Sequence, residues 1–147
     1  MTTSQTFPMP LNDVFSFFAD AGNLERITPP WLRFRILTPL PISMSAETLI
    51  DYRIRLSGIP IRWQTEIAVW EPPVRFVDVQ KRGPYRLWRH EHLFEETAEG
   101  TRVHDCVDYQ LFGGRCVHAL YVRKSLLRIF EYRRTELIKI FSASQEQ

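Results

Sequence analysis

The sequence is poor in the residues and segments that define several classes of protein. It has only two cysteines, Cys106 and Cys116, with no C-x-x-C pair and no histidines at zinc-finger spacing. We therefore expect neither a disulfide framework nor a structural zinc site, and we expect a cytoplasmic protein with reduced thiols. No run of about 18 apolar residues predicts a membrane span. The N-terminus lacks the basic region and apolar core of a secretory signal.

Catalytic and nucleotide-binding motifs are also missing. The chain contains no Gly-x-Ser-x-Gly, no P-loop and no Gly-x-Gly-x-x-Gly, so neither covalent catalysis by a serine nor dinucleotide binding on a glycine-rich loop is predicted. The formal net charge is only +2, from 19 basic and 17 acidic residues. Such a small excess gives no reason to expect a nucleic-acid partner.

The chain does have enough apolar material to build a core. Hydrophobic residues make up 44% of it and aromatic residues 13%, which is not the composition of a disordered tail. Its 147 residues are close to the usual size of one domain. Because no repeat or linker interrupts the sequence, we expect one domain over residues 1–147.

The N-terminal part predicts one edge strand followed by two short helices. The threonine-rich stretch Thr2–Phe7 suits a strand at the edge of a sheet. Residues 10–19 then carry apolar side chains at the spacing of one helical face, namely Leu11, Val14, Phe15 and Phe18. Asn23 is suited to cap a second short helix that ends near Ile27, before two prolines stop it.

From about Phe34 the apolar pattern changes to the alternation of β-strands, with turn residues at intervals of roughly ten. The even positions from Ile50 to Leu56 are apolar, and we expect them to face a core. A hairpin loop of Gly58 and Ile59 would join this strand to the next and bring the two apolar rows onto one face. Further strands are expected over residues 74–81, 85–95 and 101–111, so the middle of the chain predicts an antiparallel meander.

Residues 115 to about 142 predict one long C-terminal helix, which Gly113 and Gly114 free from the sheet. Its apolar stripe is expected to be Leu120, Leu127, Phe130, Leu137 and Phe141. Seven basic residues stand against two acidic ones between residues 112 and 141. The simplest interpretation of this charge is a face that lies in solvent.

This order of elements resembles the SRPBCC (START-like) superfamily, and within it bacterial proteins of the polyketide cyclase/dehydrase-like kind. Four stretches carry the resemblance: Phe18–Trp31, Thr48–Tyr52, Arg75–Asp78 and Gly83–Phe94. Its most specific part is the row Trp-x-His-x-His-x-Phe that ends the last stretch. The resemblance implies the α+β helix-grip fold, in which a curved antiparallel sheet wraps around a long C-terminal helix and two short helices follow the first strand.

The resemblance also implies that a small hydrophobic or aromatic ligand binds between the sheet and the helix. The superfamily includes lipid carriers, aromatase/cyclases and co-chaperone modules, so a fold of this kind does not decide activity. Our leading hypothesis is a binding protein for a lipid-like or polyketide-like molecule, without a cofactor. The alternatives are a cofactor-independent cyclase or dehydratase, and a co-chaperone or membrane-associated adaptor that uses the basic helix. We expect no integral membrane contact, and the oligomeric state stays open.

The registers of the predicted hairpins decide which polar groups reach the cavity. If the turn at Gly83 and Pro84 is tight, Asp78 lies opposite His90, and Gln80 lies opposite Trp88. A one-residue bulge at Gly100 in the next hairpin would set His92 opposite Asp105 and Trp88 opposite Tyr109. A slip of one residue would instead turn Leu87 and Leu93 inward.

Three interpretations of the two histidine–carboxylate pairs stay open at this point. Side chains that face each other across two strands are close enough for a direct or water-bridged hydrogen bond, so the pairs form a buried polar network in the simplest case. They can also act as a general acid and base, with His90, His92, Asp78 and Asp105 as the candidate catalytic residues. Two histidines and a carboxylate can bind a metal, although we predict none here.

The residues expected to contact the ligand combine these polar groups with aromatic side chains. Tyrosine and tryptophan in an apolar wall can supply the few polar contacts that orient a guest. Trp31 is placed either to border the cavity mouth or to pin its own loop, and Cys106 is expected to face away from the cavity. The predicted ligand-binding set is Tyr52, Trp63, Asp78, Gln80, Trp88, His90, His92, Asp105, Tyr109 and Phe130.

Overall fold

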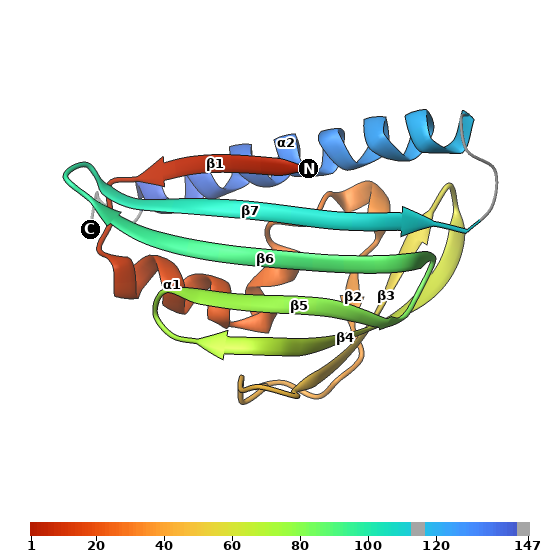
Figure 1. Ribbon diagram of the computed structural model, residues 1–147, viewed down its shortest axis with the longest axis horizontal. Helices are drawn as coiled ribbons and strands as arrows, with labels where there is room; N and C mark the ends of the chain where they lie inside the picture. The colour runs from red at the N-terminus through yellow and green to blue at the C-terminus, as the bar shows by residue number, and fades with distance from the viewer. Residues whose placement is uncertain (113–116, 144–147) are drawn as a thin grey trace.

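A computed structural model describes residues 1–112 and 117–143, and seven strands within these ranges form one antiparallel sheet in the order β1-β7-β6-β5-β4-β3-β2 (Figure 1). The strands are β1 (Thr2–Phe7), β2 (Arg35–Ile36), β3 (Leu49–Leu56), β4 (Ile59–Glu71), β5 (Arg75–Arg82), β6 (Tyr85–Thr97) and β7 (Gly100–Leu111). The helices are α1 (Leu11–Ala19), α2 (Val117–Ala143) and two short 3-10 helices, η1 (Ala21–Glu25) and η2 (Pro30–Leu32).

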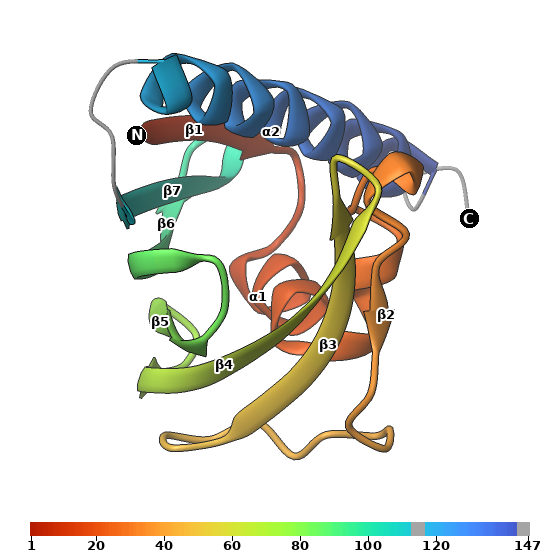
Figure 2. The same ribbon diagram turned by 90° about the vertical axis from the view of Figure 1, so that its right-hand side faces the viewer.

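The sheet is strongly curved, and the helices occupy its concave side. Figure 2 shows α1 inside the curve and α2 lying across the open side, next to β1. The short helices follow the first strand, as the sequence predicted. This arrangement is the helix-grip fold, and it brings the concave face of the sheet and one face of α2 around a common interior.

Helix α1 anchors the main hydrophobic core at one end of this interior. Its residues Val14, Phe15 and Phe18 are buried, as the helical spacing predicted. They pack in one cluster with Phe94 of β6 and Phe141 of α2. Strand β1 lies at the edge of the sheet, paired only with β7, which confirms the expected edge strand.

The second short helix begins earlier than Asn23, so that prediction was wrong. Asp20 is the N-cap of η1, where its Oδ1 accepts a hydrogen bond of 2.8 Å from the backbone nitrogen of Gly22. The amide of Asn23 instead donates to the carbonyl oxygen of Phe17 at 3.0 Å. The extended backbone of Asp20 lets a short carboxylate reach the first free N–H groups, which is the usual capping geometry.

The β3–β4 hairpin also differs in detail from the prediction. Its loop is Ser57 and Gly58, not Gly58 and Ile59, because Leu56 pairs with Ile59. Ser57 and Gly58 have φ angles of 50° and 82°, and two successive positive φ values match the twist of a tight hairpin. The correction moves the register by two residues, which preserves the parity. The apolar rows of both strands therefore still share the concave face, with Ile54 and Trp63 buried.

The two registers that place the histidines were predicted correctly. Asp78 pairs with His90 across β5 and β6, and His92 pairs with Asp105 across β6 and β7. The expected bulge at Gly100 is not part of the pairing, since the only register shift between β6 and β7 in the described residues lies between Tyr85 and Leu87. His90 and His92 thus point to the concave side of the sheet.

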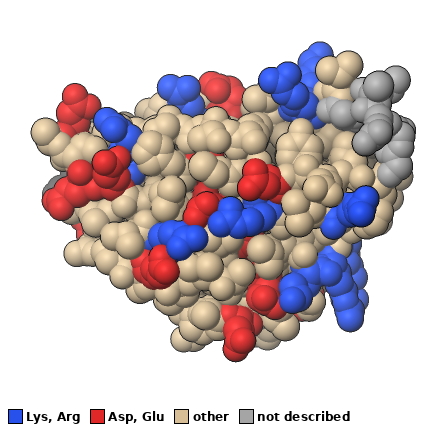
Figure 3. All heavy atoms as spheres, viewed as in Figure 1, with Lys and Arg blue, Asp and Glu red and all other residues tan. Residues whose placement is uncertain are grey.

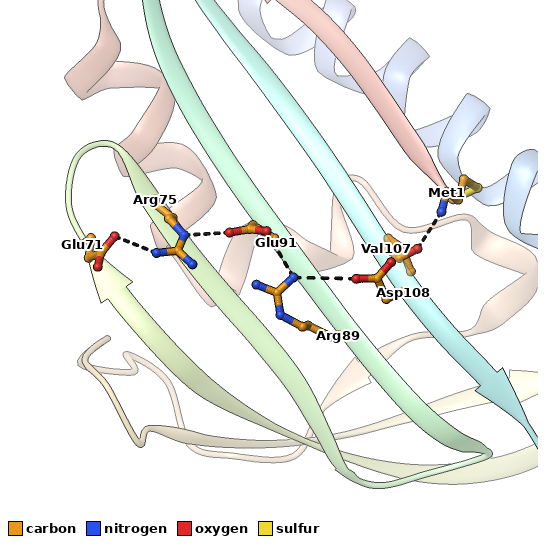
Figure 4. Close-up of polar contacts among 7 residues, drawn as sticks. All are labelled: Met1, Glu71, Arg75, Arg89, Glu91, Val107 and Asp108. Carbon is orange, nitrogen blue, oxygen red and sulfur yellow. Dashed lines mark hydrogen bonds and ion pairs between the residues drawn. The ribbon is translucent and has the colours of Figure 1, made fainter.

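The opposite, convex face of the same strands is covered by alternating charges (Figures 3 and 4). Glu91 accepts from Arg75 at 2.7 Å and from Arg89 at 3.1 Å. Arg75 also contacts Glu71 at 3.1 Å, and Arg89 lies 3.8 Å from Asp108. Because residues alternate between the two faces of a strand, this exposed network on odd positions of β6 confirms that the even positions face inward.

The predicted stripe of α2 is confirmed in its second half and wrong in its first. Leu137 and Phe141 are buried as predicted, and Phe130 lines the interior, whereas Leu120 is 70% exposed and Leu127 is 46% exposed. Leu126 is buried in place of Leu127, because one residue corresponds to about 100° around a helix. The predicted start of the helix at residue 115 and the glycines at 113 and 114 lie outside the described residues.

No helix within the described ranges combines the length and the apolar character that a membrane crossing requires. Helix α2 is the longest of them, with 27 residues.

Candidate functional site

A cavity of about 190 Å³ lies between the concave face of the sheet, the 3-10 helices and α2. Its wall is mostly apolar and aromatic, with side chains from β3, β4 and β6 on one side and Leu126 and Ile129 of α2 on the other. Besides two tyrosines, four titratable side chains line it, Asp78, His90, His92 and Arg133. A largely apolar cavity with a few convergent polar groups is the usual form of a small-molecule site.

Most of the side chains predicted to contact a ligand line this cavity. These are Tyr52, Trp63, Asp78, Trp88, His90, His92 and Phe130. Strand alternation turns them all to the concave face, with Phe130 added from α2. Trp31 is not part of the wall, because it packs edge-on against Tyr132 and under the guanidinium of Arg128. It pins its own loop to α2.

The structure places three members of the predicted set outside the cavity wall. The side-chain amide of Gln80 donates to the carbonyl oxygen of Tyr85 at 2.7 Å and accepts from its N–H at 3.2 Å, so Gln80 ties the β5–β6 turn. Tyr109 packs edge-on against Tyr85. Asp105 is buried next to the histidines, away from the cavity.

Two aromatic side chains of the wall, Tyr52 and Trp63, have their polar atoms paired with one threonine. Both the hydroxyl of Tyr52 and the indole nitrogen of Trp63 contact Oγ1 of Thr65, at 3.2 Å and 3.1 Å. Burial raises the pKa of Tyr52 well above its ordinary value, so the phenol stays neutral. These groups hold the wall together and leave the orientation of a guest to other side chains.

The histidines form their hydrogen bonds diagonally and not with the residues directly opposite. Nε2 of His90 lies 2.9 Å from Oδ1 of Asp105, and Nε2 of His92 lies 3.2 Å from Oδ2 of Asp78. The directly paired groups are also close, with Nδ1 of His90 at 3.6 Å from Asp78. The two rings are 3.9 Å apart between centroids, and this contact tilts each ring toward the neighbouring carboxylate. All four residues therefore form one network.

The position of His92 indicates that it carries a proton on both ring nitrogens. Its Nδ1 lies 2.9 Å from Oδ1 of Asp105, but the direction does not suit a hydrogen bond. If Nε2 donates to Asp78, a neutral ring would turn the lone pair of Nδ1 toward a carboxylate oxygen, which is repulsive. Burial by itself would lower the pKa of His92, yet Asp105 and Asp78 outweigh burial and raise it.

His90 is the neutral member of the pair. Burial, together with the positive charge of His92, lowers the pKa of His90 below its ordinary value. Neighbouring imidazoles that repel each other in their charged forms are expected to titrate at separate pH values. The two imidazoles therefore differ in charge at a pH between the pKa of His90 and the pKa of His92.

NMR titration is expected to show this separation directly. We expect the His92 ring to titrate above pH 6.5 and the His90 ring below it, since 6.5 is the ordinary value for histidine. Long-range proton–nitrogen spectra recorded from pH 5 to 9 would follow both rings, with His90→Gln and His92→Gln variants to assign the signals. Two rings that titrate together would contradict the proposed charge state.

Arg133 of α2 supplies the positive charge that faces the two carboxylates. Burial would raise the pKa of Asp105, but Arg133 and the hydrogen bonds from the histidines hold that pKa well below its ordinary value. The pKa of Asp78 is lowered in the same way, chiefly by His92 against burial. The guanidinium lies over the ring of Phe18, with its central carbon 5.5 Å from the ring centroid.

Sequence reasoning missed Arg133, which it had counted with the basic face in solvent. The signal was available in the spacing, because Arg133 stands seven residues after Leu126 and four before Leu137, on the face that is buried. A basic residue on the buried stripe of a helix calls for an acidic or ligand partner.

Asp78, His90 and His92 are also the residues that could hold a metal. Their ligand atoms lie within 4.8 Å of one another, and two imidazoles with one carboxylate are a known donor set for iron and other transition metals. Binding would require His92 to lose its second proton, and Arg133 would oppose the added charge. The expected absence of a metal stays a prediction.

A curved sheet that grips a C-terminal helix, with buried polar groups on its concave face, defines a helix-grip protein. The comparison with protein families agrees with that class. The chain belongs to the family described as polyketide cyclase / dehydrase and lipid transport, whose model matches residues 7–123. The search of curated proteins found no match.

Solved structures with the same fold come from several bacteria. Protein Ms6760 from Mycobacterium smegmatis is 14% identical, with 97% of this chain and 90% of that chain covered and a TM-score of 0.71. Protein NE0264 from Nitrosomonas europaea is 13% identical, with 100% and 96% covered and a TM-score of 0.73. At these identities the likeness shows the fold alone.

A third structure contains this fold as one part of a larger protein. The nucleoside-diphosphate sugar epimerase from Corynebacterium glutamicum is 25% identical over 95% of this chain, with a TM-score of 0.66. The match covers only 28% of that protein, so most of the epimerase lies outside the likeness.

Proposed function

We propose that this protein binds a small hydrophobic or aromatic molecule in the cavity between the sheet and α2. The observation that carries the proposal is the preformed, mainly apolar cavity with Asp78, His90, His92 and Arg133 at its wall. Such sites use apolar surface for affinity and a few polar groups for orientation. The family description, which names lipid transport and polyketide cyclisation, supports a ligand of this chemistry.

The size of the cavity limits the ligand. Its volume of about 190 Å³ is only slightly larger than an engineered protein cavity of about 150 Å³ that binds benzene. Sites for drug-sized ligands begin at about 300 Å³. In this structure the cavity therefore fits a guest of one ring with a few further atoms, and a sterol or a polycyclic polyketide would require α2 to move outward.

Filling the cavity from α2 should abolish binding. We expect Leu126→Trp to weaken the binding of toluene at least tenfold, because Leu126 lines the cavity and a larger side chain would occupy the space of the guest. The matched control is Leu127→Trp, on the next residue but on the exposed face of α2. Ligand-observed NMR with titrated toluene measures both.

Two results would count against the proposal. Toluene that fails to bind the unaltered protein would show that the cavity is not a site for small apolar molecules. Equal weakening in both variants would show that binding depends on the helix in general and not on the cavity. Native mass spectrometry of the protein purified from its own host would then identify any molecule that it retains.

A second candidate function is acid–base catalysis on a bound carbonyl compound. It is favoured by the neighbouring imidazoles, one neutral and one protonated, which offer a proton acceptor and a proton donor on the same cavity wall. If a retained molecule is found, conversion of that molecule by the unaltered protein but not by His92→Gln would distinguish this enzyme from a carrier.

A further inference from the structure

Two buried nitrogen atoms in the cavity wall have no hydrogen-bond partner. They are Nδ1 of His92 and Nε of Arg133, and they are the only such buried side-chain atoms among the residues that the structure describes. Native proteins leave few buried polar atoms unpaired, and each exception calls for an explanation. Nδ1 of His92 has Oδ1 of Asp105 as a neighbour at 2.9 Å, so Arg133, which lines the cavity, is the residue whose partner remains to be explained.

Several other polar groups around the cavity are already paired. Thr65 holds Tyr52 and Trp63, and the carboxylates of Asp78 and Asp105 are hydrogen-bonded by His92 and His90. A ligand that needed a donor or acceptor from these groups would have to break an existing contact. The charged donor of the wall without a hydrogen bond among the described residues is the guanidinium of Arg133.

Arg133 is the cation of this site that has no ion pair among the described residues. No carboxylate of the described residues lies within 4.0 Å of its guanidinium, although its charge lowers the pKa of both Asp78 and Asp105. The protonated His92 is held by those same two carboxylates at 3.2 Å and 2.9 Å. The carboxylates are thus engaged by the histidines, and Arg133 is a residue of the cavity wall.

A guanidinium has a planar fork of N–H groups whose spacing matches the two oxygens of a carboxylate. In a mainly apolar wall, such an ion pair is screened less by salt than one in solvent. A neutral carbonyl or hydroxyl group would satisfy at most one donor and would gain no direct ion pair. The chemistry of Arg133 therefore selects an anionic oxygen pair over a neutral oxygen.

We infer that the ligand is a small monocarboxylate of about one ring in size, whose carboxylate pairs with Arg133 while its hydrocarbon part lies against Trp63 and Trp88. Trp63 and Trp88 line the same cavity and pack edge-to-face at 5.3 Å between centroids. This inference rests on the proposed function, because it names the class of molecule for the same cavity.

The test compares benzoate with benzamide, which has the same shape without the charge. Isothermal titration calorimetry should show that the unaltered protein binds benzoate at least tenfold more tightly than benzamide. Arg133→Met should lose most of the affinity for benzoate, at least tenfold. Arg134→Met, on the adjacent exposed residue, should bind benzoate like the unaltered protein.

The outcomes separate this inference from the proposed function. If toluene binds but benzoate binds no more tightly than benzamide, the carboxylate inference is overturned and the apolar site stands. If no probe binds, both are overturned. Should Arg133→Met fail to fold, Arg133→Lys keeps the charge but not the fork, and it should bind benzoate more weakly than the unaltered protein; unchanged affinity would overturn the pairing.

Discussion

Asp105→Asn is expected to lower the free energy of unfolding by about 3–5 kcal/mol at pH 7, which is the usual cost of removing one partner from a buried charge network. The amide keeps the shape of the carboxylate but leaves His92 and Arg133 with one counter-charge fewer. It also replaces an acceptor of the hydrogen bond from His90, which is 2.9 Å long. Urea denaturation followed by circular dichroism measures the change.

The control for this variant is Asp108→Asn on the same strand. Asp108 points to the convex face, where its side chain is 66% exposed and lies 3.8 Å from Arg89. Exposed ion pairs contribute little, so we expect a change of less than about 0.5 kcal/mol. A loss of similar size in both variants would contradict the buried network as the source of the effect.

The destabilisation of Asp105→Asn should depend on pH in a definite direction. The pKa of Asp105 is depressed in the folded state, so its contribution to stability is present above the unfolded value of about 3.9 and is lost as the pH falls toward the folded value. The difference between the unaltered protein and the variant should therefore shrink below about pH 4. The same denaturation series, repeated between pH 3 and pH 7, follows it.

Phe94→Ala is expected to cost about 3–5 kcal/mol of unfolding free energy, the range for truncation of a buried phenylalanine. Phe94 is buried in the core beside α1, with its ring centroid 5.1 Å from that of Phe15 and 5.3 Å from that of Phe18. Removal of the ring leaves a cavity that these rigid neighbours cannot fill. Thermal and urea denaturation measure the loss.

Phe112→Ala is the matched control for this second variant. Phe112 is 69% exposed just after β7, and its truncation should change the free energy of unfolding by no more than about 0.5 kcal/mol. If Phe94→Ala also stayed within 1 kcal/mol of the unaltered protein, the packing of α1 against β6 would not be as described.

The aromatic core and the cavity lie side by side, but substitutions in them are expected to have different effects. In the core they affect stability, and in the cavity they affect ligand binding. Around Phe94 the rings fill the space, and large-to-small changes should be costly. Around Trp63 and Leu126 a cavity of about 190 Å³ is left open, so that enlargement of a side chain is the change with the greater effect on binding. The closely packed core thus lies at the C-terminal end of α2, and the cavity lies along the middle of the helix.

The histidine site shows what the alternation of side chains along a strand can predict. The alternation of Trp88, His90, His92 and Phe94 on one strand face follows from the two-residue period of a strand. The tight turns at Gly83 and Gly100 then set the partners across the strands, and those partners are as expected. Alternation and turn length act over a few neighbouring residues, which is why they can be read without coordinates.

The contacts inside the site could not be predicted in this way. The diagonal hydrogen bonds depend on the tilt of two neighbouring rings, and the placement of Gln80 depends on its reach to the backbone of Tyr85. These are choices among side-chain rotamers that lie close in energy. The neighbours of each side chain in space decide between them.

The sequence by itself determined the order of the elements, the face of each strand that turns inward and the pairing of Asp78 and Asp105 with the two histidines, because these follow from local periodicity and turns. Only the tertiary structure decided which residues in the first half of α2 meet the sheet. Packing against distant strands and the short helices brings Leu126 and Arg133 inward and leaves Leu127 more exposed. The cation that completes the site therefore comes from a contact between distant segments of the chain.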